Sequence, residues 1–239
     1  MLTVTRVTKK FGNDDAVQDI SFRIEKGEIY ALIGPNGSGK TTLVKSISGL
    51  LRIDSGEILV DGVSVMKSPQ KTKSVIGYIP DEPSAWVGMT GEEFLHVVGA
   101  LFGVEATERA SRISELLKRF SLERIATQVF DDYSRGSKQK FSIISALLHE
   151  PTLLLVDEPI VGLDPESATI AKALLREFAD GGGSVLLVTH TLPVAEEIAS
   201  RIGLLHEGKL VAEGDMTQLR ERAGLSSAST LEEVYHSLA

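Results

Sequence analysis

The chain of 239 residues contains no cysteine. This absence excludes disulfide bonds, thiolate metal sites and cysteine nucleophiles, and it is typical of a protein from a reducing compartment. The chain also lacks long apolar runs. None approaches the roughly 20 residues that a membrane-spanning helix needs, and residues 1–6 do not begin an apolar segment of signal-peptide length. We therefore expect a chain that is soluble by itself and that reaches a membrane only through a partner.

Positive charge is the second shortage. The formal net charge is −8 at pH 7, so no overall field attracts nucleic acid, and we expect no nucleic-acid partner. Hydrophobic residues make up 42% of the chain and charged residues 24%, as in an ordinary globular protein. This length can fold as one large domain or as one domain with a subdomain. We predict a single domain over residues 1–239.

A glycine-rich stretch dominates the first quarter of the chain. It fits the phosphate-loop pattern Gly-x-x-x-x-Gly-Lys-Ser/Thr, and its residues are Gly34, Pro35, Asn36, Gly37, Ser38, Gly39, Lys40, Thr41 and Thr42. The glycines let successive backbone N–H groups point into one concavity that suits anionic oxygens. Lys40 brings positive charge to the β- and γ-phosphates, and the Thr41 hydroxyl can bind Mg²⁺. The pattern predicts a nucleotide site.

The flanks of this stretch support the prediction. Residues 28–33 form an apolar run typical of a buried strand, and residues 42–51 have apolar positions at helical spacing. The order strand, glycine loop, helix is the one that a phosphate loop requires. The alternative is a glycine-rich turn that binds nothing, and these flanks argue against it.

Strand and helix patterns alternate along most of the chain. In the first 83 residues, apolar and polar residues alternate in segments that predict strands at 2–7, 20–24, 57–60 and 74–79. Later in the chain, we expect strands at 152–157, 184–189, 201–206 and 209–212, and helices at 165–179 and 192–200. The pattern predicts an α/β fold with a mainly parallel core sheet, and paired strands precede the phosphate loop.

Two segments depart from this alternation. Residues 84–150 carry helical patterns at about 90–102 and 107–120, with a third helix expected to begin near Ser121. We interpret 84–150 as a helical subdomain inserted in the α/β core. Residues 215–239 contain two cap-like starts, at Asp215 and Thr230, and we expect a short helical extension there.

Acidic residues follow a second apolar strand. Leu153 to Val156 are four apolar residues that lead to Asp157 and Glu158. At the end of a buried strand, Asp157 is placed to bind Mg²⁺ and Glu158 to polarise an attacking water. The alternative is a buried strand with solvated acids at its tip. His190 also follows a strand, where open α/β sheets bind ligands, and we expect it to hydrogen-bond a γ-phosphate.

Together these motifs resemble the nucleotide-binding subunit of an ATP-binding-cassette (ABC) transporter. The resemblance covers nearly the whole chain, and the motifs occur in the order of that family. Residues 161–164 look like its D-loop, which ends in Asp164. Residues 133–140 look like its signature sequence, at Ser134, Gly136 and Ser137. The signature also precedes a helical pattern, so its hydroxyls and helix N-terminus suit an oxyanion.

The resemblance implies a fold, a reaction and partners. It implies the P-loop ABC ATPase fold, with an antiparallel N-terminal β subdomain and an inserted helical subdomain. Lys40, Glu158 and His190 would be catalytic, Phe11 would stack on adenine, and Val17 would lie beside the base. The cofactors would be ATP and Mg²⁺. Two subunits, identical or not, would sandwich two ATP molecules head to tail, with each signature facing the other subunit's γ-phosphate. A separate transmembrane permease would hold the subunit at the cytoplasmic face of the membrane.

Some positions depart from the family pattern. Asp81 replaces the usual glutamine, and its carboxylate can meet Mg²⁺ or water but donates no hydrogen bond. Arg135 and Ser137 replace glycine and glutamine of the signature, and we expect these changes to tune nucleotide binding. These departures resemble bacterial exporter-type subunits, including Ecs-like ones.

Several alternatives stay open at this point. A soluble ABC protein that acts on nucleic acid or ribosomes is the main rival, although the chain has none of the usual second cassette, zinc motif or basic extension. A nucleotide sensor without hydrolysis is disfavoured by Glu158 and His190. The transported substrate and the direction of transport are not given by the sequence. Trp86, the single tryptophan, is either a core residue or an exposed anchor for the permease.

Overall fold

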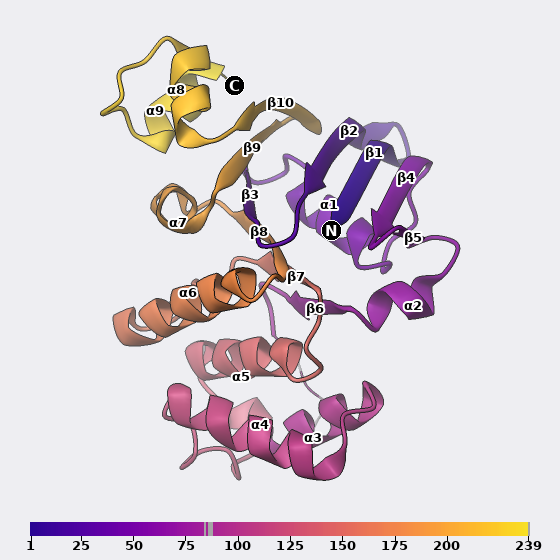
Figure 1. Cartoon of the computed structure of the whole chain (residues 1–239), viewed down its shortest axis with the longest axis vertical. Coiled ribbons are helices and arrows are strands. Elements are labelled where there is room, and N and C mark those ends of the chain that lie inside the picture. The colour runs from indigo at the N-terminus through magenta and orange to yellow at the C-terminus, as the bar shows by residue number, and fades with distance from the viewer. Residues whose placement is uncertain (84, 86–87, 239) are drawn as a thin grey trace.

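A six-stranded sheet forms the centre of the computed structural model, which describes residues 1–83, 85 and 88–238 (Figure 1). Five of its strands are parallel, and β10 pairs antiparallel with β9 at one edge. In spatial order the strands are β10 (Lys209–Gly214), β9 (Arg201–His206), β3 (Ile29–Ile33), β8 (Ser184–Thr189), β7 (Leu153–Asp157) and β6 (Ile76–Ile79). The carboxyl ends of β3, β7 and β8 therefore reach the same edge of the sheet, where open α/β sheets bind ligands.

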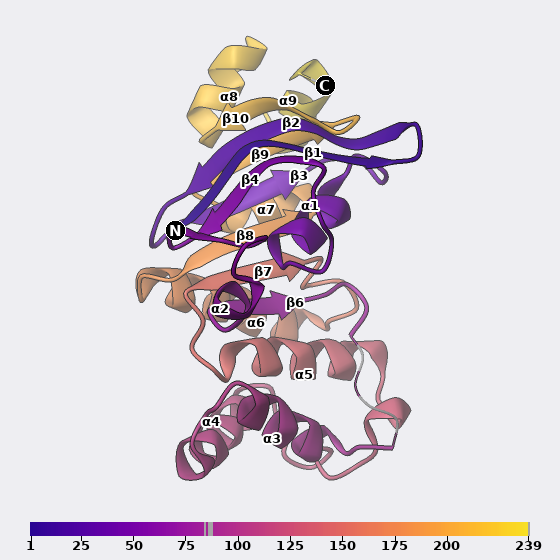
Figure 2. The same cartoon turned by 90° about the vertical axis from the view of Figure 1, so that its right-hand side faces the viewer.

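A second sheet of four antiparallel strands covers one face of the first (Figure 2). In spatial order its strands are β2 (Asp14–Ile24), β1 (Leu2–Phe11), β4 (Ser55–Val60) and β5 (Val63–Ser64). The strands predicted at 2–7 and 20–24 are parts of the longer β1 and β2, which form a hairpin. Gly12 adopts φ +60° in its turn, a conformation that glycine reaches without strain.

Side chains of the central strands alternate between two cores, one on each face of the sheet. On β3, Tyr30 and Leu32 join the core under the four-stranded sheet, together with apolar residues of helix α1 (Lys40–Ile47). Ile29, Ala31 and Ile33 face the other core, which helices cover. This period of two on a fully buried strand explains why the sequence shows a continuous apolar run there.

The remaining helices lie around the six-stranded sheet and at the two ends of the molecule. In chain order they are α2 (Pro69–Lys73), α3 (Gly91–Leu101), α4 (Ala106–Arg119), α5 (Arg135–Leu147), α6 (Pro165–Asp180), α7 (Leu192–Ile198), α8 (Met216–Ala223) and α9 (Leu231–Leu238). Figure 2 shows α3 and α4 at the far end of the molecule from α8 and α9, with α5 between α3–α4 and the sheet.

One predicted helix is wrong. Residues 121–129 form turns, and α5 begins only at Arg135, after a short 3-10 helix at Phe130–Asp132. The cause is local, because Ser121 adopts φ +54° and so ends α4. Ser134 then provides the N-cap that starts α5, where its hydroxyl accepts from the Ser137 backbone N–H at 3.1 Å.

The predicted capping box before α3 is present. Thr90 Oγ1 accepts from the Glu93 backbone N–H at 3.2 Å, and the Glu93 carboxylate accepts from the Thr90 backbone N–H at 2.9 Å. Thr90 also forms an isolated bridge with Val129, so the described part of the segment between β6 and β7 is not purely helical. The division into a helical subdomain at 84–150 and an extension at 215–239 stays a prediction.

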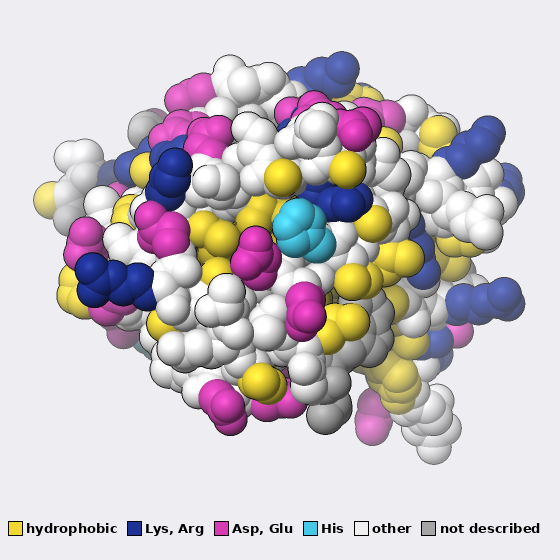
Figure 3. Space-filling model, turned by 90° about the horizontal axis from the view of Figure 1, so that it is seen from below, with side chains coloured by type: hydrophobic (Ala, Val, Ile, Leu, Met, Phe, Trp, Pro, Cys, Tyr) yellow, Lys and Arg dark blue, Asp and Glu magenta, His cyan; other side chains and the backbone are white. Residues whose placement is uncertain are grey.

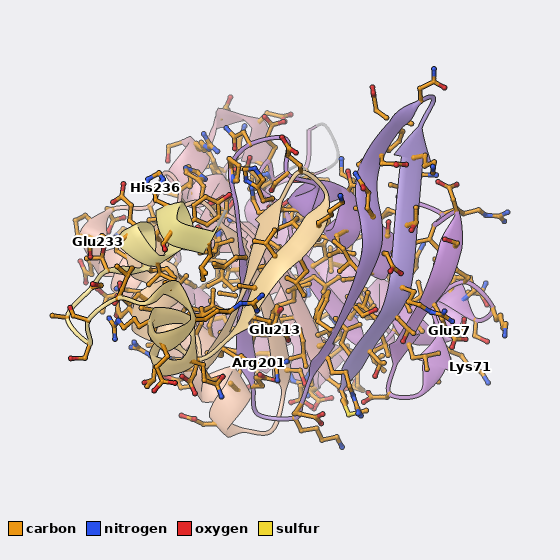
Figure 4. All side chains as sticks on the ribbon, turned by 90° about the horizontal axis from the view of Figure 1, so that it is seen from above. Glu57, Lys71, Arg201, Glu213, Glu233 and His236 are labelled. Carbon is orange, nitrogen blue, oxygen red and sulfur yellow. The ribbon has the colours of Figure 1, made fainter. Side chains whose placement is uncertain are left out.

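A charged cluster joins β9 and β10 to the centre of the sheet. Arg201 lies 3.1 Å from a carboxylate oxygen of Glu213 (Figure 4). It also lies 3.4 Å from a carboxylate oxygen of Glu28, and its guanidinium lies over the Tyr30 ring. Burial raises the pKa of Tyr30 well above its ordinary value, so this ring stays neutral.

Seen from below, the opposite end of the molecule carries acidic and basic side chains interspersed with apolar ones (Figure 3).

The contact between β6 and α5 leaves no room for a side chain at Gly77. A Cβ there would lie 2.4 Å from the Ala146 carbonyl oxygen and 2.6 Å from a methyl group of Leu154. We expect Gly77→Ala to lower the free energy of unfolding by about 1–3 kcal/mol, the usual range for overpacking a core. Urea unfolding measures the change.

Gly99→Ala is the matched control. A Cβ at Gly99, within α3, meets mainly the flexible side chain of Arg109, which can move away. Alanine also favours the helix by about 1 kcal/mol. A loss of stability in the Gly99 variant as large as that in the Gly77 variant would contradict this description of the β6–α5 contact.

Candidate functional site

The predicted phosphate loop connects β3 to α1. Gly39 adopts φ +103°, and a Cβ there would lie 2.2 Å from the Ala16 carbonyl oxygen, so only glycine fits. Lys40, the first residue of α1, is 8% exposed. Its ammonium group donates to the carbonyl oxygens of Gly34 at 2.7 Å and Pro35 at 2.8 Å. The lysine charge is thus held over the concave side of the loop.

Burial and two carboxylates act on Lys40 in opposite directions. Burial lowers the pKa of Lys40, while the negative charges of Glu158 and Asp157 raise it, and the net direction is downward. A partly desolvated ammonium group that has only carbonyl oxygens as hydrogen-bond partners is suited to exchange them for phosphate oxygens.

Asp157 ends β7 and is 4% exposed. Burial raises the pKa of Asp157 to about 6, and the nearby charges of Glu158 and Asp81 act in the same direction. The Thr41 hydroxyl, which hydrogen-bonds the carboxylate, and the charge of Lys40 oppose this shift. The Asp157 carboxylate and the Thr41 hydroxyl therefore face one another beside the phosphate loop.

This donor set fits Mg²⁺. In the described part of the chain, no three His, Cys, Asp or Glu side chains come together in a group that could hold a metal ion. Mg²⁺ does not need such a cage, because it usually takes one or two protein oxygens and completes its shell with phosphate oxygens and water. The Thr41 hydroxyl and the Asp157 carboxylate are ligands of that kind.

Glu158 is held by the end of the neighbouring strand β8. It adopts φ +52°, which turns its side chain toward β8, and its carboxylate is almost fully buried. One oxygen accepts from the Thr189 hydroxyl at 2.8 Å, and the other accepts from the His190 backbone N–H at 2.7 Å. His190 Nδ1 lies 2.6 Å from this second oxygen, a contact that requires a proton on Nδ1 because the carboxylate accepts.

These groups line one cleft of about 430 Å³. Its walls include ten predicted site residues, which are Asn36, Gly37, Gly39, Lys40, Thr41, Thr42, Asp81, Asp157, Glu158 and His190. They come from the phosphate loop, from the ends of β7 and β8, and from the segment after β6. Four segments distant in sequence therefore converge on the carboxyl edge of the sheet.

Other predicted residues stand back from this cleft. Gly34 and Ser38 are buried behind the loop, and Pro35 is exposed beside it. Phe11 is 52% exposed near the tip of the β1–β2 hairpin, with the Lys9 ammonium 5.5 Å from its ring centre. An aromatic ring that is half exposed is free to stack on a planar group.

Val17 is not where the sequence places it. It was expected beside the base, but its side chain is fully buried and belongs to the core under the four-stranded sheet. A Cβ at Gly39 would lie 3.5 Å from a Val17 methyl group, so Val17 supports the loop from within. Ala16 lines the cleft in its place. The alternation of β2 decides this, because neighbouring residues face opposite sides.

Ser134, Gly136 and Ser137 of the signature, and Asp164, do not line the cleft of their own chain. Ser134 is exposed at the start of α5, and Gly136 and Ser137 follow it within the first turn. Asp164 caps α6, where it accepts from the Ser167 backbone N–H at 2.9 Å and lies 3.1 Å from the Lys140 ammonium. Hydrogen bonds from the Ser167 hydroxyl and from the Ser167 backbone N–H, together with the Lys140 ammonium, hold the pKa of Asp164 well below its usual value.

Sequence reasoning missed some residues of the cleft. Ala16 and Val161 line it, although neither was assigned a contact with the nucleotide, and Arg135, expected only to tune nucleotide binding, lines the cleft of its own chain. Opposite charges at Asp81 and Arg135, two positions that both depart from the family pattern, were the available signal.

Trp86 lies outside the described residues, so neither interpretation of it is tested. No helix within the described residues has the length and apolar character needed to cross a membrane.

Comparison with known proteins identifies the family to which this chain belongs. A model of the family described as "ABC transporter" matches residues 17–161. The chain is 35% identical to the linearmycin resistance ATP-binding protein LnrL of Bacillus subtilis over 94% of this chain and 72% of LnrL. It is 33% identical to the ABC-type transporter ATP-binding protein EcsA of the same organism, over 98% of this chain and 95% of EcsA.

Solved structures give the same result for the fold. An ATP-binding subunit of an ABC transporter superposes with a TM-score of 0.95 at 33% identity, covering 100% of this chain and 99% of that one. A dimer of the ATP-binding cassette MJ0796 in a post-hydrolysis state with ADP and phosphate superposes with a TM-score of 0.83 at 27% identity, covering 90% and 99%. These likenesses confirm the predicted resemblance and fold class.

The raised pKa of Asp157 has a consequence for stability. Because this pKa is about 6 in the folded protein and lower in the unfolded chain, the folded state loses stability as the pH rises from about 4 to about 6. Asp157→Asn removes the charge and keeps the shape. At pH 7 we expect the variant to be more stable than the wild type by on the order of 1–3 kcal/mol.

Thermal unfolding at pH 7 and at pH 4 measures this difference. At pH 4 both side chains are neutral in the folded protein, so the two melting temperatures should nearly coincide. An asparagine variant that is less stable than the wild type at pH 7 would show that the carboxylate is stabilised, not strained, by its surroundings.

Proposed function

Since this chain belongs to the ABC transporter family, we propose that it is the subunit that binds and hydrolyses ATP to drive a solute through a separate membrane permease. The chain is an ATP-hydrolysing enzyme of that family. The observation that carries the proposal is the cleft in which Lys40, Asp157, Glu158 and His190 meet. A phosphate loop, a magnesium-binding carboxylate and a buried base in one cleft are the parts that phosphoryl transfer to water requires.

Each residue has a role that its contacts support. Lys40 exchanges the carbonyl oxygens of Gly34 and Pro35 for phosphate oxygens. Thr41 and Asp157 would hold Mg²⁺, which when bound with ATP neutralises charge on the phosphates. Glu158, fixed by Thr189 and by the His190 backbone, takes the proton of the attacking water.

His190 both orients Glu158 and faces solvent. Its Nδ1–H donates a hydrogen bond to the Glu158 carboxylate, and its side chain is 56% exposed. The other ring nitrogen, Nε2, is the one that would contact a γ-phosphate at the end of β8.

We place the second half of the site on another cassette. Ser134, Gly136 and Ser137 lie at the start of α5, away from the cleft of their own chain. A head-to-tail dimer, in which each signature covers the other chain's ATP, uses these residues as the resemblance implies. The likeness to a dimeric cassette with ADP and phosphate supports this arrangement. ATP closes the dimer and hydrolysis reopens it.

A groove next to the cleft is the proposed docking place for a cytoplasmic segment of the permease. It consists of two adjoining hollows of about 580 and 280 Å³, and Leu50, Tyr78 and Ser145 line both. Leu50 is 61% exposed, and the half-exposed ring of Phe102 stacks on His149 at the groove floor. Exposed apolar side chains in a hollow are typical of a protein-binding surface.

The groove is continuous with the nucleotide cleft. Thr41, Asp81 and Asp157 line both, so a segment in the groove lies directly behind the proposed metal ligands. This continuity gives a physical route by which the nucleotide state can move the permease. With such a partner the chain lies at the cytoplasmic face of the membrane. The Ecs-like and resistance-type relatives favour export as the direction.

Replacing the base tests the catalytic proposal. Glu158→Gln keeps the shape of the side chain but cannot accept a proton, so hydrolysis should fall at least about a hundredfold. ATP should then be trapped, and sedimentation with Mg²⁺ and ATP should show a dimer that the wild type does not accumulate. Glu57→Gln, an exposed change on β4, is the control and should behave as the wild type.

Continued hydrolysis by the Glu158 variant at the wild-type rate would rule out Glu158 as the base. If neither protein hydrolyses ATP but both bind it, even in membranes that contain the permease, the chain is a nucleotide sensor.

A pair of leucine variants tests the docking groove. Leu50→Asp places a charge inside the groove, whereas Leu101→Asp places one on an exposed residue that lines neither hollow. We expect the Leu50 variant to lose most of its association with membranes of its own host, and the Leu101 variant to keep it. Equal association of both variants would exclude this groove as the docking place.

A further inference from the structure

Asp81 and Arg135 meet at the rim of the nucleotide cleft. Arg135 Nη2 lies 2.9 Å from Asp81 Oδ1, although 54 positions separate the two residues in the chain. Both line the cleft together with Lys40, Asp157 and Glu158. They are also two positions at which this chain departs from the family pattern. The departures are therefore not independent, because their side chains are in contact.

The backbone directs Arg135 into the cleft. Arg135 is the first residue of α5, directly after the N-cap, and its neighbour Gly136 packs against the loop that follows β7. A Cβ at Gly136 would lie 2.6 Å from the Gly162 carbonyl oxygen. Gly162 adopts φ +85°, and a Cβ there would lie 3.4 Å from the Arg135 Cγ and Cδ atoms. The aliphatic part of Arg135 therefore crosses Gly162 and carries the guanidinium to Asp81.

Charge gives this contact its importance. Three carboxylates line the cleft, and Asp81 is close enough to Asp157 to help raise the pKa of Asp157. A nucleotide brings several more negative charges into the same space. The only lysine and arginine among the described residues that line the cleft are Lys40 and Arg135. Without Arg135, the Asp81 carboxylate would face the phosphates unpaired and oppose their binding.

We propose that Arg135 is a positioning residue for the nucleotide site, which binds Asp81 within its own chain and cancels the charge of that carboxylate. This inference rests on the proposed ATP site. The pair holds one Asp81 oxygen toward α5. It also ties the start of α5 to the segment after β6, so the signature end of the helix and the phosphate cleft are linked by one ion pair.

A double-mutant cycle tests the inference. Asp81→Asn, Arg135→Ala and the double variant are compared with the wild type by their affinity for Mg-ATP, measured on the isolated chain. Arg135→Ala should weaken binding about fivefold, the upper end for exposed ion pairs, because the unpaired carboxylate repels the phosphates. The double variant should return to within about twofold of Asp81→Asn.

Salt distinguishes a charge effect from a folding effect. The loss in Arg135→Ala should shrink when the ionic strength rises from about 0.05 to 0.5 M, since salt screens the exposed carboxylate. Arg176→Ala is the matched control. Its guanidinium lies 3.2 Å from Glu197, and the exposures of that pair are close to those of Arg135 and Asp81, but neither residue lines the cleft. This control should leave affinity unchanged.

Each other outcome has a definite meaning. An equal loss from Arg135→Ala with and without the Asp81 carboxylate would overturn the inference and show that Arg135 contacts the nucleotide itself. No loss in Arg135→Ala would show that the pair does not act on the site. A wild-type chain that fails to bind Mg-ATP would refute the proposed function instead, and the cycle keeps these results apart.

Discussion

Burial of two adjacent carboxylates at the end of β7, together with the repulsion between them, is the constraint on which the site depends. Asp157 and Glu158 are adjacent in sequence, and each is less than one-tenth exposed, so neither is well solvated. The fold tolerates them because each finds a partner at a different strand end. Thr41 from α1 hydrogen-bonds Asp157, while Thr189 and His190 from the end of β8 hold Glu158. The negative charge of the two carboxylates is balanced only in part by the Lys40 ammonium group.

This unbalanced negative charge relates the stability of the fold to its function. Folding brings the two carboxylates together at a cost in stability. A magnesium nucleotide that binds beside them reduces this cost, and its binding is more favourable for that reason. Parallel strands make this possible, because β3, β7 and β8 end side by side and deliver the loop, the acids and the histidine to one edge. The Asp81–Arg135 pair extends the same logic to the rim of the cleft. The Asp81 carboxylate is tolerated there because Arg135, the first residue of α5, forms an ion pair with it.

Local motifs were the predictable part of the fold and of the site. The phosphate loop, Asp157, Glu158 and His190 could be placed because each follows a strand with a clear apolar pattern. Residues whose position depends on through-space contacts could not. Val17 turned inward because the register of β2 fixes which neighbour faces the loop. The helix expected to begin near Ser121 is absent, because the left-handed backbone of Ser121 is not encoded by periodicity. The role of Arg135 depends on Gly162 and on Asp81, both remote in sequence.

We propose that a second cassette completes the site with its signature. The chain has no cysteine, so a single introduced thiol is unique. Asn36→Cys and Ser134→Cys, each at an exposed position and each combined with Glu158→Gln, should be mixed with a short bifunctional thiol reagent. We predict cross-linking between the two variants that appears with Mg-ATP and not without it. A mixture that binds Mg-ATP yet gives no such cross-link, or gives it equally without nucleotide, would contradict the head-to-tail arrangement.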